Sequence, residues 1–280
     1  MTSPKLPDDI ADTVRRALAE DVGSGDLTAQ LVPDAQAHAE LVTREHAVLC
    51  GTAWVDETFR QLDTRVRIAW RKHDGERITA GDVIARLDGP ARALLTGERC
   101  ALNFLQTLSG TATRTASYVD ALHGMRSKVL DTRKTIPGLR RAQKYAVTCG
   151  GGFNHRLGLY DAVLIKENHI ATAGSVSAAL VQARAAVAAD VPLEIEVENL
   201  EQLREALNAG ATRVLLDNFD LERLAAAVRE TAGRATLEAS GGVTLDNIRA
   251  IAETGVDFIS VGSLTKHLHA IDLSLRFLPR

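Results

Sequence analysis

The amino-acid sequence predicts an α/β protein in which a small β-rich domain precedes a β/α barrel. Two observations carry this prediction. From Lys128 onward, six short apolar runs each end in a polar residue or a glycine, and Ala/Leu-rich amphipathic stretches separate most of them. Before residue 105, apolar residues instead alternate over short segments divided by Gly and Asp turns. Strands and helices alternating at this pitch form parallel sheets, and six such units favour a closed barrel over an open Rossmann sheet.

The N-terminal part is expected to hold a helix and several short strands. Asp8 to Glu20 has apolar residues at helical spacing. Thr64 to Trp70 alternates strictly, as a half-buried strand does. The same reading predicts a strand pair in 37–49 and a strand at Val83 to Leu87.

Thr96 to Leu122 reads as long helical segments, in which Gly110 marks a break or a close helix contact. We place the domain boundary within this region, near residue 105. The predicted domains are residues 1–105 and a barrel of residues 106–267, with the tail 268–280 packing on the first domain.

The six expected barrel strands are KVLDTRK, AVLIKEN, LEIEVEN, RVLLDNF, TLEASGG and FISVGS. No GxGxxG follows the first of them, which weighs against a dinucleotide site. In a barrel the carboxyl ends of the strands share one face, and active sites lie there. The polar residues that end these runs should therefore converge.

Composition excludes several classes of protein. The chain of 280 residues carries a net charge of −3, which argues against duplex DNA binding. No signal peptide and no run of 18 apolar residues is present, so we expect a cytoplasmic enzyme without a membrane span. The three cysteines form no CxxC, and Cys149 is better explained as a buried structural thiol than as a nucleophile.

A basic cluster stands out between Asp131 and His169. This stretch holds seven Lys/Arg and three acids, a formal charge of +4 in an acidic chain. Such a cluster indicates a focused anion site. The residues assigned to the site are Arg133, Lys134, His155, Arg156 and Lys166, whereas Arg140, Arg141 and Lys144 are expected to solvate a helix.

Acidic residues follow on the next two strands. Glu194, Glu196 and Glu198 alternate with apolar residues, and Asp217 closes the following strand. Buried carboxylates must meet cations, metal or sugar hydroxyls. Glu196 and Asp217 could hold ribose hydroxyls or Mg²⁺, or form salt bridges to the nearby cations, and these interpretations are compatible.

Glycine turns end the last two expected strands. They contain Ser240, Gly241 and Gly242, and then Gly262 and Ser263, each before a possible helix start at Thr244 or Ser263. Backbone N–H groups at such turns bind phosphate, and late barrel strands are the recurrent place for it. The alternative is that the turns need glycine only for conformation. The acids and glycines together suggest a phosphorylated sugar beside a polyanionic partner.

These motifs resemble the quinolinate phosphoribosyltransferases, also called carboxylating nicotinate-nucleotide pyrophosphorylases. The resemblance covers roughly the last two-thirds of the chain, and DVGSGDLT near the N-terminus also fits. It is carried by GERCALNFLQTLSGTAT, DTRKTIPGLR, KYAVTCGGGFNHRLGLYDAVLIKENH, EIEVEN, LLDN, EASGG and ISVGSLT.

The resemblance implies an N-terminal α/β sandwich domain, an atypical seven-stranded β/α barrel and a homodimer. It implies that quinolinate and phosphoribosyl pyrophosphate give nicotinate mononucleotide, pyrophosphate and CO₂ with Mg²⁺, in de novo NAD biosynthesis. We predict six strands, so the seventh strand of the family must lie in a segment that we interpret as loop or helix.

The resemblance also implies a role for each site residue. Arg133, His155, Arg156 and the neighbouring subunit's Arg99 would surround the quinolinate carboxylates. Lys134 and Lys166 would serve the carboxylates and the pyrophosphate. Glu196 and Asp217 would face ribose and metal, and the glycine turns with Ser240 and Ser263 would take the 5′-phosphate.

Three other functions are alternatives to a phosphoribosyltransferase. Lys166 could form a Schiff base, as barrel aldolases do. A non-catalytic anion-binding relative, such as one associated with molybdenum transport, would keep the glycine turns but lose part of the cationic cluster, which is complete here. A purely structural domain leaves the +4 cluster unexplained.

Overall fold

The computed structural model describes residues 5–279 and divides them into two compact units. The first unit contains the chain up to Ala116, residues 135–151 and the chain from Leu264 onward. The second contains residues 117–134 and 152–263. The predicted boundary near residue 105 falls inside a helix of the first unit, and the segment 135–151 belongs to the first unit although the prediction assigned it to the barrel.

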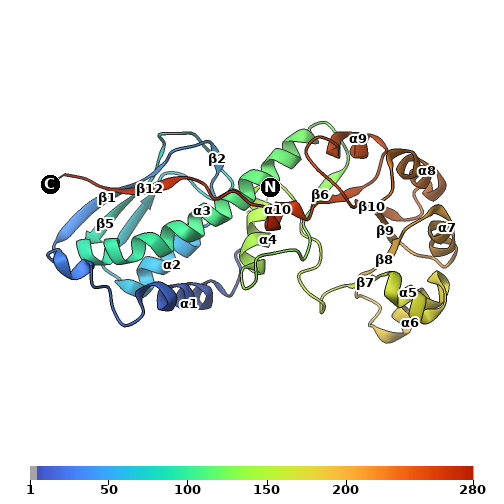
Figure 1. Ribbon diagram of the computed structural model, residues 1–280, viewed down its shortest axis with the longest axis horizontal. Coiled ribbons are helices and arrows are strands. Elements are labelled where there is room, and N and C mark those ends of the chain that lie inside the picture. The colour runs from blue at the N-terminus through green and yellow to red at the C-terminus, as the bar shows by residue number, and fades with distance from the viewer. Residues whose placement is uncertain (1–4, 280) are drawn as a thin grey trace. The chain divides into compact units, whose positions relative to one another are not determined.

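The first unit is built on an antiparallel sheet with the strand order β12-β1-β5-β3 (Figure 1). Its edge strand β12 comes from the C-terminal tail and pairs with β1, so the chain end closes this sheet. The four strands are β1 (Gln36–Thr43), β3 (Arg67–Trp70), β5 (Val83–Pro90) and β12 (Leu273–Phe277).

The expected strand pair in 37–49 is wrong as a pair. Both strands exist, but β1 belongs to the large sheet, while β2 (Ala47–Val48) pairs antiparallel with β4 (Arg77–Ile78). The alternating pattern predicted the strands and could not predict their partners. The helices and the 3-10 turn of this unit are α1 (Ile10–Val22), η1 (Ala29–Leu31), α2 (Thr52–Leu62), α4 (Arg140–Cys149) and most of α3 (Ala91–Ala121).

Helix α3 runs for 31 residues without interruption, so Gly110 does not break it. A Cβ atom at this glycine would lie 2.1 Å from the carbonyl oxygen of His269. Gly110 therefore allows a close backbone approach, which is the second of the two roles that the sequence left open.

The core of the first unit is aliphatic. Leu41, Leu87, Leu102 and Leu105 are 2% exposed or less and belong to one buried cluster. Burying apolar side chains of this size is the main stabilising contribution to such a unit.

Helix α4 corrects the expectation that three basic residues solvate a helix. Arg141 is exposed and pairs with Asp8, but Lys144 is only 1% exposed. The helix packs Ala142, Tyr145 and Ala146 into a cluster that also contains Trp54. Most of its surface is therefore buried, and Lys144 is buried with it.

The second unit contains a parallel sheet with the order β6-β11-β10-β9-β8-β7, and the connecting helices lie along its outer side (Figure 1). All six expected strands are confirmed: β6 (Lys128–Leu130), β7 (Val163–Ile165), β8 (Leu193–Val197), β9 (Arg213–Asp217), β10 (Thr236–Ser240) and β11 (Phe258–Ser260). The helices between them are α5 (Glu167–Ala173), α6 (Val176–Ala186), α7 (Leu200–Asn208), α8 (Leu221–Thr231) and α9 (Ile248–Glu253), and α10 (Ser263–Lys266) follows the last strand.

A further strand-like contact extends the sheet at its β6 edge. Phe153 forms an isolated parallel bridge with Leu130. Its backbone N–H donates to the carbonyl of Val129 at 2.9 Å, and its carbonyl accepts from the N–H of Asp131 at 3.0 Å. Phe153, in a segment predicted as loop, thus takes the position of a seventh strand. This strand is one residue long, which is too short to produce an apolar run in the sequence.

Candidate functional site

A pocket lies at the carboxyl ends of the barrel strands. Seven of the residues assigned to the site line it, because each one lies close to the carboxyl end of a strand or just beyond it. The full lining is Thr132, Arg133, Lys134, His155, Arg156, Leu164, Lys166, Glu196, Leu215, Glu238, Ser240 and Ser260.

Two arginines crowd the pocket. Burial lowers the pKa of the Arg156 guanidinium, and the neighbouring positive charge of Arg133 lowers it further. Arg156 Nη1 donates to the carbonyl of Ala162 at 3.0 Å, which fixes the side chain. Two guanidinium groups that repel each other favour a bound anion, and their planar forks suit a carboxylate.

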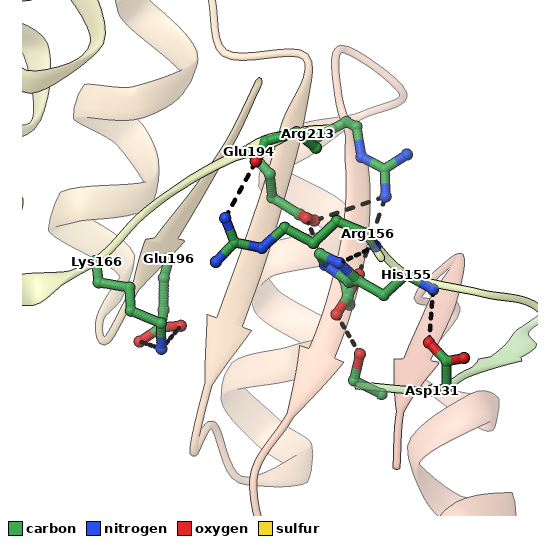
Figure 2. A network of polar contacts seen from close by, with 10 residues as sticks. Asp131, His155, Arg156, Lys166, Glu194, Glu196 and Arg213 are labelled. Carbon is green, nitrogen blue, oxygen red and sulfur yellow. Dashed lines mark hydrogen bonds and ion pairs between the residues drawn. The ribbon is translucent and has the colours of Figure 1, made fainter. Parts of the chain in front are cut away.

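Lys166 and Glu196 form an ion pair on neighbouring strands. Lys166 Nζ lies 3.0 Å from Glu196 Oε2. Figure 2 marks this contact with a dashed line. Burial raises the pKa of the Glu196 carboxyl, and the Lys166 ammonium partly offsets this rise. A salt bridge of Glu196 to a nearby cation was one of the interpretations compatible with the sequence. Both residues line the pocket.

Asp217 ends β9 opposite Ser240 of β10 in the parallel register. Its Oδ2 accepts a hydrogen bond from Asn218 Nδ2 at 2.7 Å. The negative charge of Asp217 contributes to the raised pKa of Glu196, so the two carboxylates lie within electrostatic reach of each other. Carboxylate oxygens repelling one another form a donor set that suits Mg²⁺.

The glycine turns differ from each other. Gly241 and Gly242 have φ values of 100° and 61°, so their conformation itself requires glycine. A Cβ atom at Gly262 would lie 3.0 Å from the Cδ atom of Lys134, which places this glycine directly beside the cationic pocket. Ser263 begins α10, and its Oγ lies 3.2 Å from the Tyr118 hydroxyl. The expected helix start at Thr244 is wrong, since α9 begins at Ile248.

Arg99 belongs to the first unit. It lies on α3 and is exposed. Its expected role in the site of a neighbouring subunit stays a prediction.

Three residues of the pocket lining, His155, Glu238 and Ser260, belong to a polar network that the sequence did not predict as a whole. His155 Nε2 lies 2.9 Å from Glu194 Oε2 and 3.6 Å from Glu238 Oε2. Arg213 Nη2 lies 3.8 Å from Glu194 and 4.0 Å from Glu238, and Ser260 donates a short hydrogen bond to Glu238. Figure 2 shows His155, Glu194 and Arg213 gathered together, apart from the Lys166–Glu196 pair.

Glu238, Arg213 and Ser260 were missed in the sequence. Glu238 is 1% exposed, and burial together with the charge of Glu194 raises its pKa to about 7. The available signal was a glutamate in the middle of the apolar run TLEAS, where a charge is costly unless it is paired.

Two clusters have the residue types of metal sites, but the carboxylates of both are already engaged in polar contacts within the protein. The ligand atoms of His155, Glu194 and Glu238 lie within 4.8 Å of one another, and Arg213 and Ser260 already contact the carboxylates.

Cys50, Asp74 and Cys149 form the second cluster, in the first unit. Asp74 accepts from the N–H groups of Gly51 and Thr52 and from the hydroxyl of Tyr145. Burial raises the pKa of the Cys50 thiol, which disfavours the thiolate that binds metals. Cys149 is buried, as expected of a structural thiol.

The fold and the pocket define an enzyme with a β/α barrel and a cationic site at the carboxyl ends of its strands. Comparison with known proteins then identifies the family. The family model for the C-terminal domain of quinolinate phosphoribosyl transferase matches residues 111–276, and that for its N-terminal domain matches residues 26–109. The chain belongs to the quinolinate phosphoribosyl transferase family.

Individual relatives agree with this membership. The chain is 46% identical to the probable carboxylating nicotinate-nucleotide pyrophosphorylase of Bacillus subtilis, over 91% of this chain and 89% of the relative. It is 44% identical to the carboxylating enzyme of Mycobacterium leprae, over 94% and 95%. The solved nicotinate-nucleotide pyrophosphorylase of Francisella tularensis superposes with a TM-score of 0.94 at 48% identity and covers 99% of both chains.

Within residues 5–279, no helix combines the length and the apolar character needed to cross a membrane.

Proposed function

We propose that the pocket at the carboxyl ends of the barrel strands is where this chain carries out the reaction of its family. The chain is a pentosyltransferase that moves phosphoribosyl from phosphoribosyl pyrophosphate to quinolinate with decarboxylation, in NAD biosynthesis. The observation that carries the location is the convergence of Arg133, Lys134, Arg156 and Lys166 on one pocket that also holds Glu196.

Quinolinate has two adjacent carboxylates on a pyridine ring. Arg133 and Arg156 bind them, since two neighbouring guanidinium groups match two carboxylates in charge and shape. Binding also relieves the repulsion between the arginines, so the pocket favours a dianion over a monoanion. Nicotinate, which lacks one carboxylate, would leave part of this repulsion uncompensated.

The phosphoribosyl partner occupies the other side of the pocket. Ser240, Gly241, Gly242, Gly262 and Ser263 receive the 5′-phosphate, while Lys134 and Lys166 neutralise the pyrophosphate. Glu196 and Asp217 face the ribose, where negative charge favours an oxocarbenium-like centre. The bond from ribose C1 to pyrophosphate breaks with its electrons going to pyrophosphate, and the lone pair of the quinolinate nitrogen forms the new bond to C1. Support for this placement is the ion pair of Lys166 with Glu196, which joins the expected pyrophosphate and ribose positions.

The second step is the loss of CO₂ from the ring carbon next to the nitrogen. The carbon–carboxylate electron pair stays on the ring carbon, where the new pyridinium nitrogen and the nearby cations stabilise it before protonation. No nucleophilic side chain is required, so catalysis is positional and electrostatic. A Schiff base at Lys166 is disfavoured, because its ammonium is ion-paired and its side chain is 46% exposed, whereas Schiff-base lysines are desolvated.

We also propose that Mg²⁺ binds at Glu196 and Asp217. Their oxygen donors and mutual repulsion fit a hard divalent cation, which would neutralise pyrophosphate oxygens when bound. The homodimer, with Arg99 reaching the neighbouring site, and the cytoplasmic location are proposals as well. The free, buried cysteines are typical of a reducing compartment.

One assay tests the proposed function. Purified protein is incubated with quinolinate, phosphoribosyl pyrophosphate and Mg²⁺, and the release of CO₂ and nicotinate mononucleotide is followed. We expect both products in equal amounts. Nicotinate replaces quinolinate in the matched control, and turnover of nicotinate alone would refute the proposed substrate.

A further inference from the structure

Asn218 has a left-handed backbone conformation. It follows directly after β9 with a φ of 55°, and between residues 5 and 279 Ala232 is the other non-glycine residue with a positive φ. Asparagine adopts this conformation more readily than most residues, yet an extended backbone would be the ordinary continuation of a strand. A left-handed residue of this kind persists where the surrounding contacts hold it.

The backbone of Asn218 is held from two sides. Its N–H donates to the carbonyl of Ser240 at 2.9 Å, which is one residue beyond the parallel register of Asp217 with Ser240. Its carbonyl accepts from Nη2 of Arg223, on α8, at 3.1 Å. Arg223 is itself bound to Asp220 at 2.9 Å. These contacts fix Asn218 between the end of β9 and the turn that follows β10.

The side chain of Asn218 contacts two groups of the site. Its Nδ2 donates to Oδ2 of Asp217 at 2.7 Å. An ionised carboxylate only accepts hydrogen bonds, so the amide nitrogen faces Asp217 and the amide oxygen faces the other way. That oxygen lies beside Gly241, since a Cβ atom at this glycine would overlap Asn218 Oδ1. One amide therefore lies between an acid at the end of β9 and the glycine turn at the end of β10.

The two glycines of this turn differ in their surroundings. Both have a positive φ, but a Cβ atom at Gly242 would have no other atom within 4 Å. At Gly241 a Cβ atom would also lie only 3.0 Å from the backbone nitrogen of Asn218. Gly241 is thus needed for its conformation and for the space that Asn218 takes. The turn is packed against Asn218 at this one position.

A neutral amide suits the place beside Asp217. The hydrogen bond fixes the direction of the carboxylate, and it leaves the negative charge in place because the donor carries none. A cation at the same position would neutralise the charge that the ribose or a metal ion would meet. The direction of the Asp217 carboxylate and the position of the glycine turn therefore depend on the same side chain.

We propose that Asn218 is a positioning residue that fixes the Asp217 carboxylate and the turn of residues 240–242 relative to each other, and thereby raises the affinity for phosphoribosyl pyrophosphate. The inference rests on the proposed function, in which Asp217 faces the ribose and the turn receives the 5′-phosphate. Both groups belong to one ligand, whose covalent bonds limit the distance between them. A side chain that fixes the matching distance in the protein pre-organises the site for that ligand.

Two substitutions of Asn218 and a matched control test the proposal. Asn218→Gly accepts the left-handed backbone and removes the amide. Asn218→Asp keeps the shape and tolerates the same backbone but cannot donate to Asp217, and it keeps the test valid should the glycine variant not fold. Ala232→Gly is the control, since Ala232 has a φ of 47°, lies at the far end of α8 and does not line the pocket.

The two substrates should respond differently. In calorimetry with Mg²⁺ in the buffer, the Kd for phosphoribosyl pyrophosphate should rise about tenfold in both Asn218 variants, while the Kd for quinolinate stays within about twofold. The KM values from initial rates should divide in the same way, and Ala232→Gly should change neither. Unchanged affinity for phosphoribosyl pyrophosphate in the folded Asn218 variants would overturn the proposal. Equal losses for both substrates would overturn it as well, because they would indicate a general disruption of the barrel.

A double-mutant cycle tests whether Asn218 acts through Asp217. Asn218→Gly should raise the Kd for phosphoribosyl pyrophosphate about tenfold in the wild-type background. In an Asp217→Asn background it should raise this Kd by no more than about threefold, because the carboxylate that Asn218 directs is already missing. A full tenfold rise in both backgrounds would contradict the coupling of the two residues.

The outcomes also separate this inference from the proposed function. A wild-type protein that does not bind phosphoribosyl pyrophosphate would contradict the proposed function, and the inference with it. Binding by the wild type with the same affinity in the Asn218 variants would contradict the inference alone.

Discussion

The strands of the first unit and the strands of the barrel sheet differ in the polar side chains that they bury. Between its antiparallel sheet and α3, the first unit buries leucines such as Leu41, Leu87 and Leu105. The barrel strands bury Glu194, Glu238 and Ser260 among their apolar residues. An aliphatic core stabilises without specifying chemistry, whereas buried carboxylates cost free energy unless cations and hydrogen bonds compensate them.

In this two-unit enzyme, the buried carboxylates lie in the unit that also holds the cationic pocket. Glu194 and Glu238 of the barrel lie close to His155 and Arg213, and Glu238 and His155 also line the pocket that carries the cations. The polar groups of the barrel thus form two sets: carboxylates that are buried in the strands, and cations that line the pocket. Substitutions should affect turnover in the barrel pocket, stability in the aliphatic core, and the pH dependence of stability in the buried network.

The largest effect is expected among the cations that line the pocket. Arg133→Ala should reduce quinolinate turnover by about 10² to 10³-fold, or roughly 3–4 kcal/mol, because a fixed charge facing the dianion is removed. Initial rates at saturating substrate measure it. Arg141→Ala, which removes an exposed arginine of α4, is the matched control and should leave turnover unchanged. Near-normal turnover in Arg133→Ala would sink the site assignment.

The next effect belongs to the aliphatic core. Leu105→Ala removes a side chain that is 0% exposed and should lower the free energy of unfolding by roughly 2–5 kcal/mol, since the cavity cannot fully collapse. Chemical denaturation measures the loss. Leu31→Ala, at a leucine that is 82% exposed, should change stability by only about 0.5 kcal/mol. A small loss at Leu105 would contradict the picture of a tightly packed core.

A smaller effect, visible only in its pH dependence, is expected in the buried network. Burial raises the pKa of Glu238 from 4.5 to about 7, so the folded protein holds a proton that the unfolded chain releases. The stability from this proton is complete below about pH 4.5 and is lost as the pH rises through about 7.

Glu238→Gln removes the titration while keeping the shape. Between about pH 5 and pH 8 the wild type should lose roughly 1–3 kcal/mol more unfolding free energy than the variant, at about 1.4 kcal/mol per pKa unit. Denaturation curves of both proteins at the two pH values give this difference. If the unfolding free energies of both proteins changed equally with pH, Glu238 would be ionised over the whole pH range. Its neighbours would then stabilise its negative charge more strongly than its raised pKa indicates.

The smallest effect lies on the outer layer of the barrel. Asn199 caps α7, and its side chain accepts from the N–H of Gln202 at 2.9 Å. Asn199→Ala should cost about 1 kcal/mol of unfolding free energy, while Asn199→Asp should keep most of the stability because aspartate also caps. Thermal unfolding compares the three proteins. Equal stability of the alanine variant would show that the cap is replaced by water.

The strands of the barrel and the cationic stretch could be predicted from the amino-acid sequence alone. Each strand is a short apolar run with a polar end, and that pattern follows from burial on both faces of a parallel sheet. The positions of Arg133, Lys134, Lys166 and Glu196 in one pocket follow as well, because the carboxyl ends of parallel strands lie on one face. The order of apolar and polar residues within each segment is enough to predict these features.

The strand pairings and side-chain contacts could not be predicted from single segments and became known from the structure. It placed β1 and β2 in different sheets, buried Lys144 within α4, and supplied Phe153 as a single bridging residue. It also brought Glu238 and Arg213, from separate strands, to His155. Pairing, burial and compensation depend on residues far apart in the chain, and the period of a single segment carries no information about them.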